Sequence, residues 1–243
     1  MKKTRFLALA LVVAVMLMGA GYAAWTDQLV INNTVETGEL NVVFVEQEGS
    51  IYPPQGPYPI ILAGDVTGNV NPMNCFTEVS IDQENQKLTT VKVENLYPGV
   101  MTYYHVKFQN IGTIPAKVDN IVINKLQTSE ALDEEMVMFG GYTHYKLDGT
   151  TAGAPFLCTF ENFEQTMNNL LAGIELKKGE FVTFDITDES KEQLNEMLIP
   201  YGITLPEEEH CIFMHLPAEG STNASQGQTA EFQILLNFKQ FNM

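Results

Sequence analysis

Histidine is the residue type that most often holds a metal ion or moves a proton, and this chain has four: His105, His144, His210 and His215. None belongs to an HExxH motif, which places two imidazoles and a glutamate base on one helix. His210 and His215 are five residues apart in a strand-like segment, so their side chains would point to opposite faces. The three glutamates at 207–209 are typical of a solvated acidic turn. We therefore predict no metal site.

Nucleophilic catalysis is not indicated either. The sequence has no Gly-x-Ser-x-Gly turn, no triad-like spacing, no glycine-rich phosphate loop and no aspartate-rich calcium loop. Cys158 comes close to a predicted helix start, which could stabilise a thiolate, but its apolar neighbours favour a packed core position. Cys75, Cys158 and Cys211 allow at most one disulfide, and the alternative is three buried small side chains. We expect no catalytic residue and no cofactor.

The first 24 residues have the composition of a secretory signal peptide. Lys2, Lys3 and Arg5 precede an apolar run over residues 6–18, and small residues follow. This run is shorter than the roughly 20 apolar residues that cross a membrane as a helix. A membrane anchor at this end is the alternative. We predict that residues 1–24 are removed and that residues 25–243 form a single secreted domain without a stable membrane span.

The charge of the chain excludes two classes of partner. All 30 acidic residues, but only ten of the 13 basic ones, lie after residue 24, which leaves a net charge of −20. Such a surface repels nucleic acid and anionic lipid headgroups. It also keeps a secreted protein soluble until a local interaction overcomes the repulsion.

Side chains alternate along residues 25–35 as they do in a half-buried strand. The apolar members of one face are Trp25, Leu29, Ile31 and Val35. This strand would begin at the new N-terminus, so it is a candidate donor strand that adds to an edge of another subunit. The alternative is an ordinary first strand of its own sheet.

The rest of the chain is predicted to be mostly β. Residues 49–74 are rich in Gly, Pro and Asn and indicate a long loop. Apolar periodicity predicts two helices, one around residues 160–174 and one that ends before Pro200, with Asp188 as its possible cap. Strands are expected over residues 40–45, 76–81, 88–93, 103–108, 118–123, 142–147, 182–186, 211–216 and 231–238. The expected fold is a mainly β, jelly-roll-like antiparallel sandwich with about two peripheral helices.

Several short motifs, in order, resemble the TasA/camelysin family of secreted proteins of Gram-positive bacteria. Tyr22-Ala23-Ala24 followed by Trp25 resembles the processing site that a dedicated, SipW-type signal peptidase cuts in this family. Thr37-Gly38-Glu39-Leu40 resembles the Gly-x-Leu after the first strand. The turn at residues 95–99 and the strand–turn–strand at residues 106–118 also resemble the family pattern, whereas the Pro-rich loop departs from it.

The resemblance implies a jelly-roll subunit of extracellular biofilm-matrix fibres, in which the N-terminal strand of one subunit completes the sheet of the next. Cleavage would follow Ala24 and leave Trp25 first. The expected partners are other copies of the chain, the dedicated signal peptidase and an accessory anchoring protein, and the expected location is the extracellular matrix or cell surface. Two alternatives remain: a camelysin-like cell-surface metalloprotease, and a monomeric adhesion or ligand-binding module.

Overall fold

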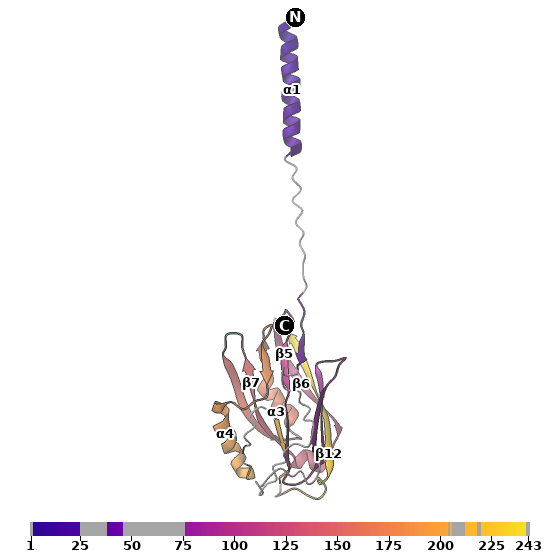
Figure 1. The fold of residues 1–243 in the computed structure, drawn as a ribbon, viewed down its shortest axis with the longest axis vertical. Coiled ribbons are helices and arrows are strands. Elements are labelled where there is room, and N and C mark those ends of the chain that lie inside the picture. The colour runs from indigo at the N-terminus through magenta and orange to yellow at the C-terminus, as the bar shows by residue number, and fades with distance from the viewer. Residues whose placement is uncertain are drawn as a thin grey trace. The chain divides into compact units, whose positions relative to one another are not determined.

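The computed structural model describes residues 2–24, 38–45, 76–203, 205, 212–217 and 220–241. The chain divides into two units, Met1–Thr37 and Gly38–Met243 (Figure 1). The first unit contains helix α1 (Lys2–Ala24), and the second contains the strands. No helix within the described part of the chain is both long and apolar enough to span a membrane.

The first sheet is antiparallel throughout and is built around β7. β10 and β11 pair with the same side of β7, one after the other, and continue to β5 and β4, while β8 pairs with the other side. β1 completes the sheet beside β5. The strands are β1 (Val42–Phe44), β4 (Met101–Tyr104), β5 (Lys107–Asn110), β7 (Val137–Tyr145), β8 (Thr151–Thr159), β10 (Phe181–Thr183) and β11 (Ile212–His215).

The second sheet has the order β2-β3-β12-β6-β9 and is also antiparallel. Its long strands, β6 and β12, are paired from one end of the domain to the other, with two register shifts. The strands are β2 (Phe76–Ile81), β3 (Leu88–Leu96), β6 (Ala116–Gln127), β9 (Glu175–Leu176) and β12 (Gln228–Gln240).

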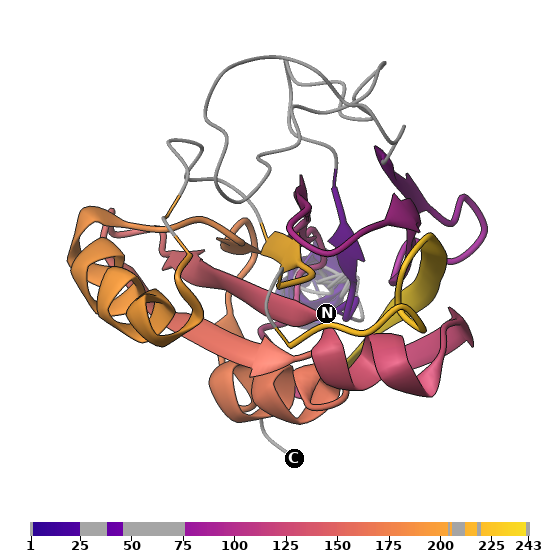
Figure 2. The same ribbon diagram turned by 90° about the horizontal axis from the view of Figure 1, so that it is seen from below.

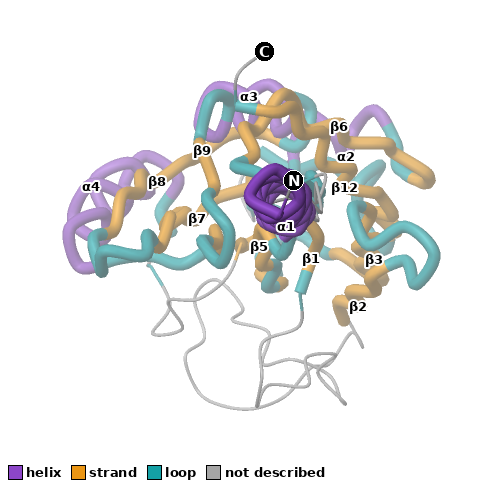
Figure 3. The backbone as a smooth tube through the Cα atoms, turned by 90° about the horizontal axis from the view of Figure 1, so that it is seen from above, coloured by secondary structure: helices purple, strands orange, loops and turns teal. Residues whose placement is uncertain are grey.

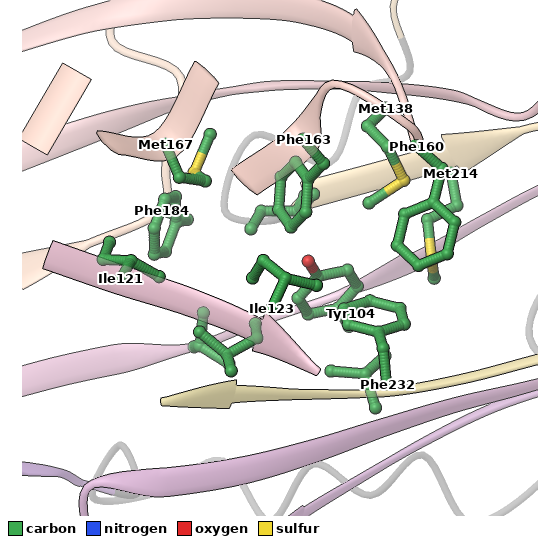
Figure 4. Close-up of a cluster of buried hydrophobic side chains, with 14 of the residues drawn as sticks. Tyr104, Ile121, Ile123, Met138, Phe160, Phe163, Met167, Phe184, Met214 and Phe232 are labelled. Carbon is green, nitrogen blue, oxygen red and sulfur yellow. The ribbon is translucent and has the colours of Figure 1, made fainter. Parts of the chain in front are cut away.

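The main hydrophobic core fills the space between the two sheets. Alternating positions of β12 provide one wall, with Phe232 fully buried, and Met138 and Met214 come from the opposite sheet. Phe232 contacts both Phe160 and Phe163, at ring-centroid distances of 4.9 and 6.3 Å (Figure 4). Area burial of this kind is the dominant stabilising contribution in a chain that has too few cysteines for a disulfide framework.

Three helices flank the sandwich. α2 (Glu130–Glu135) connects β6 to β7 and is capped by the Ser129 hydroxyl. α3 (Phe163–Leu171) buries Phe163, Met167 and Leu171. α4 (Asp188–Leu198) covers the outer face of the first sheet with Leu194 and Leu198, against Phe139 and Phe213, and ends in a 3₁₀ turn, η1 (Ile199–Tyr201).

The predicted fold class is confirmed: strands hold 43% of the residues and helices 24%, in an antiparallel sandwich. Two elements were not predicted, and one predicted helix cap was wrong. Cys158 lies in strand β8, which was not predicted, because its small residues carry little alternation. α2 was also missed, since it has only six residues, most of them acidic. Thr187 rather than Asp188 caps α4, with its hydroxyl accepting from Ser190 N–H.

Candidate assembly interface

Two of the histidines that the structure describes, His144 and His215, are buried in the domain. His215 is buried, and its Nδ1 lies 3.1 Å from the Val100 carbonyl oxygen, so that Nδ1 carries the proton and donates it. Burial lowers the pKa of His215 to about 4. His144 is also buried, with Nε2 3.5 Å from a carboxylate oxygen of Glu180, and burial lowers its pKa despite this neighbour. Both imidazoles therefore stay neutral at neutral pH.

Metal or thiol chemistry finds no support among the described side chains. No group of three His, Cys, Asp or Glu residues in this part of the chain is arranged to hold a metal ion. Burial raises the pKa of the Cys158 thiol to about 11, which keeps it protonated and unreactive. His210, Cys75 and Cys211 lie outside the described residues.

On one flank of the sandwich, α3 covers the edge of β6 with polar side chains. The Asn168 side chain accepts from the Ile121 N–H at 2.9 Å and donates to the Ile121 carbonyl at 2.8 Å. Glu164 accepts from the Ile123 N–H at 2.8 Å. Because these are the bonds that an added strand would make, α3 takes its place along this part of β6 (Figure 3).

A pocket of about 530 Å³ lies over the same edge, next to the bonded groups. Lys125 spans one side of it: its Nζ lies 4.5 Å from the centre of the Phe160 ring and 2.7 Å from Asp133. The pocket is lined by Ile123, Lys125, Phe160, Glu161, Glu164, Gln165 and Asn168.

The edge strand of the first sheet on this flank, β8, contains a proline. β7 and β8 pair without a register shift from Val137 to Tyr145, and Pro155 lies opposite Gly141. Because proline has no N–H, its nitrogen must point away from β7, toward the edge. The edge of β8 thus lacks a donor at its centre, which makes it a poor template for another strand.

The opposite flank has edges of another kind. Asp82 donates its N–H to the Leu88 carbonyl of β3, so by alternation the main-chain groups of Thr77, Val79 and Ile81 point away from β3. These N–H and C=O groups form no hydrogen bond with any other described residue. The side chains of the same three residues pack inward.

The edge of β4 lies on this flank as well. β4 ends the order of the first sheet, with β11 on one side and no described strand on the other. The hydroxyls of Thr77 on β2 and Thr102 on β4 are hydrogen-bonded across the sandwich, and both residues are buried. β1 and β2 lie together on this side, away from α3 (Figure 3).

Residues 38–41, where the chain enters the domain, are clamped by the turn between β5 and β6. Thr113 and Ile114 donate their N–H groups to the Glu39 carbonyl, and Gly112 donates to the Asn41 carbonyl at 3.0 Å. A Cβ atom on Gly112 would overlap the Glu39 carbonyl and lie 2.6 Å from the Asn41 nitrogen, so only glycine fits. The motif at residues 37–40 and the motif at residues 106–118, both of which carry the family resemblance, are therefore in contact with each other through these bonds.

The residues predicted for processing and assembly belong to the other unit. Tyr22, Ala23 and Ala24 form the last turn of α1. The donor-strand residues Trp25, Leu29, Ile31 and Val35 lie outside the described residues, and so does the predicted Pro-rich loop at 49–74. The sandwich thus contains the edges of β2 and β4 with which no described strand pairs and the clamp around residues 38–41, and the donor strand stays a prediction.

Sequence reasoning missed Asn168 and Glu164. They are four residues apart, so they lie on one face of α3, beside its apolar stripe. Two polar residues at this spacing are common on exposed helices and gave no signal of the edge that they cover. Searches of family models, of curated proteins and of solved structures found no match for this chain.

Proposed function

We propose that the chain is a secreted structural subunit that assembles into extracellular biofilm-matrix fibres by strand exchange. Residues 25–35 of one copy would add to the flank of the next copy that is formed by β2 and β4, here called the open flank. This would happen after a signal peptidase has removed residues 1–24. An anchoring protein would attach the fibre to the cell surface. No chemistry is assigned to the subunit.

The observation that carries this proposal is the unequal treatment of the strand edges. Asn168, Glu164 and Pro155 protect the edges on the α3 flank. Thr77, Val79 and Ile81 on β2 offer N–H and C=O groups that no described residue binds. Soluble proteins usually protect such edges, so an edge that no described residue protects favours a binding role.

The common direction of β2 and β4 is compatible with one strand that is added to this flank. β2 and β4 both run from the end of the domain that carries α2 toward the end that carries residues 38–41. A strand that enters the flank with residue 35 near the α2 end would run antiparallel to both. Four buried side chains, each worth roughly 1.5–3 kcal/mol, would hold it in place.

Electron microscopy and sedimentation of the chain that begins at residue 25 test this function. We expect filaments, and we expect Ile31→Asp to leave soluble particles because it charges the buried face of the donor strand. Val30→Asp is the matched control, since Val30 belongs to the other face and its replacement should leave filaments.

Other results would contradict the proposal. Particles that cleave casein, and lose this activity on chelation, would indicate the metalloprotease. Stable monomers without such activity would indicate the adhesion or ligand-binding module. Equal effects of the two Asp substitutions would show that residues 25–35 do not act as a strand with one buried face.

A further inference from the structure

The end of the sandwich that holds residues 38–41, here called the root end, exposes large apolar side chains. Ile111, Leu147 and Phe241 are 48%, 67% and 47% exposed. All three belong to this end, because Ile111 donates its N–H to the Asn41 carbonyl, Phe241 donates to the Pro115 carbonyl, and Leu147 follows the hairpin strand β7. Apolar groups gathered at one end indicate a contact surface.

The root end is also where the lysines gather. Half of the ten lysines after residue 24 are there: Lys117, Lys146, Lys177, Lys178 and Lys239. Lys239 pairs with Asp119 at 2.7 Å, whereas Lys146, Lys177 and Lys178 are exposed around the β7–β8 and β9–β10 turns. The pKa of Asp148 between them is lowered first by Thr150 and further by Lys146 and Lys177. This end lacks the strong negative charge of the chain as a whole.

The opposite end, here called the far end, is acidic. α2 closes it, and the first turn of α2 contains only acidic charges (Figure 2). Asp133 is held by Lys125 and Glu135 accepts the Thr222 N–H, while Glu130 and Glu134 are exposed. Leu126, at the end of β6, is 53% exposed beside them.

The length of the connection brings these two ends together. If residues 25–35 pair with the next copy, only Glu36 and Thr37 join them to Gly38, the first described residue of the root end. Such a connection spans at most about 10 Å. If the added strand runs antiparallel to β2 and β4, residue 35 lies at the far end of the receiving copy, and the root end of one copy then lies against the far end of the next.

We propose that the root end docks on the far end of a second copy, with Lys146, Lys177 and Lys178 facing the carboxylates of α2. This inference rests on the proposed function and adds a second interface to it. The charge pairing would favour this polarity of the fibre, because two far ends would bring carboxylates together, whereas a root end brings lysines to them. Head-to-tail contacts of this kind need not close into a ring, so further copies can add and form a filament.

Charge reversal tests the contact in the chain that begins at residue 25. Lys177→Glu with Lys178→Glu should raise the concentration needed for filaments about tenfold, because carboxylates would then face α2. Adding Glu130→Lys and Glu134→Lys to the same chain should restore most of the loss, since each copy carries both ends. The control, Lys107→Glu with Lys191→Glu, makes the same change in net charge on the outer side of the first sheet and in α4.

Each result decides the matter. Loss in the double variant, rescue in the fourfold variant and little effect in the control would support the contact. Equal losses in the double variant and the control, or no rescue, would overturn this inference and leave strand exchange intact. A wild-type chain that stays monomeric would overturn both proposals. Thermal unfolding of all variants, including the half-buried control positions, checks that the substitutions leave the fold unchanged.

Discussion

On the α3 flank the N–H groups of Ile121 and Ile123 in β6 are bonded by side chains, whereas those of Val79 and Ile81 in β2 bind no described residue. Both strands end a sheet or nearly do so, and both bury their inward side chains. The difference lies in the protection of the main chain. It shows that a sandwich can protect the main chain along one flank without changing its core, by placing a short helix beside that flank.

The largest effect is expected when a proline is placed in the edge strand β2, as Pro155 is in β8. Val79→Pro removes an N–H that points away from β3, so the sheet keeps its own hydrogen bonds while the edge loses a donor. We expect filament formation to stop, with a loss of unfolding free energy of only about 1 kcal/mol. Electron microscopy and chemical denaturation measure the two effects.

Ser80→Pro is the matched control for this change, because the Ser80 N–H points toward β3. It should destabilise the domain by roughly 3 kcal/mol or more. Filaments that persist in Val79→Pro would show that β2 is not the receiving edge.

The protected flank can be opened by Asn168→Ala. This change leaves the N–H and C=O of Ile121 without their partner and should lower the unfolding free energy by roughly 2–3 kcal/mol. Hydrogen exchange at the Ile121 amide should accelerate, while the polarity of filaments stays the same. Asn168→Asp is the control, because its carboxylate can still accept from the Ile121 amide. We expect slower exchange in Asn168→Asp than in Asn168→Ala. Equal rates would mean that the body of α3, and not the Asn168 side chain, protects this edge.

The open flank should respond to pH through His215, which joins β11 to the turn before β4. Its pKa is about 4 in the fold and near 6.5 in the unfolded chain. Above pH 6.5 both states are neutral and the group has no effect. Between pH 6.5 and 4 His215 is protonated only in the unfolded chain, so the unfolding free energy decreases as the pH is lowered. The decrease is about 2 kcal/mol between pH 7 and pH 5.

Denaturation of wild type and His215→Gln at pH 7 and pH 5 isolates this contribution. His144, whose pKa is also lowered, is present in both chains and cancels in the difference. The two chains should lose different amounts of stability on acidification. Parallel losses would mean that His215 is already solvated in the folded domain.

The smallest effect is expected from Pro155→Val, which restores a donor to the centre of the β8 edge. Because β8 keeps its pairing with β7, stability should change by less than about 1 kcal/mol. Filaments should associate sideways more readily, visible as thicker bundles in electron micrographs. Unchanged bundles would show that other features of β8 already suffice to protect it.

The sequence by itself determined the sandwich class and most of its elements. Alternation located β2 at Phe76–Ile81, and the turn before β4 has positive φ at Gly99, as Pro98-Gly99 predicts. Apolar spacing placed α3 and α4 to within a few residues. These features depend on local periodicity and backbone restrictions, which neighbouring residues carry. β8 and α2 escaped because a strand of small residues and a six-residue acidic helix have little periodicity.

Only the tertiary structure decided which edges are protected and where the charges gather. Asn168 meets Ile121 across 47 positions of the sequence, and Thr77 meets Thr102 from the opposite sheet. Gly112 is needed because the main chain of Glu39 and Asn41 occupies the space that a Cβ atom would take. The lysines of the root end come from two turns, β7–β8 and β9–β10, and from strands β6 and β12. Such proximities arise from strand pairing between distant segments, and no local pattern in the chain records which segments will pair.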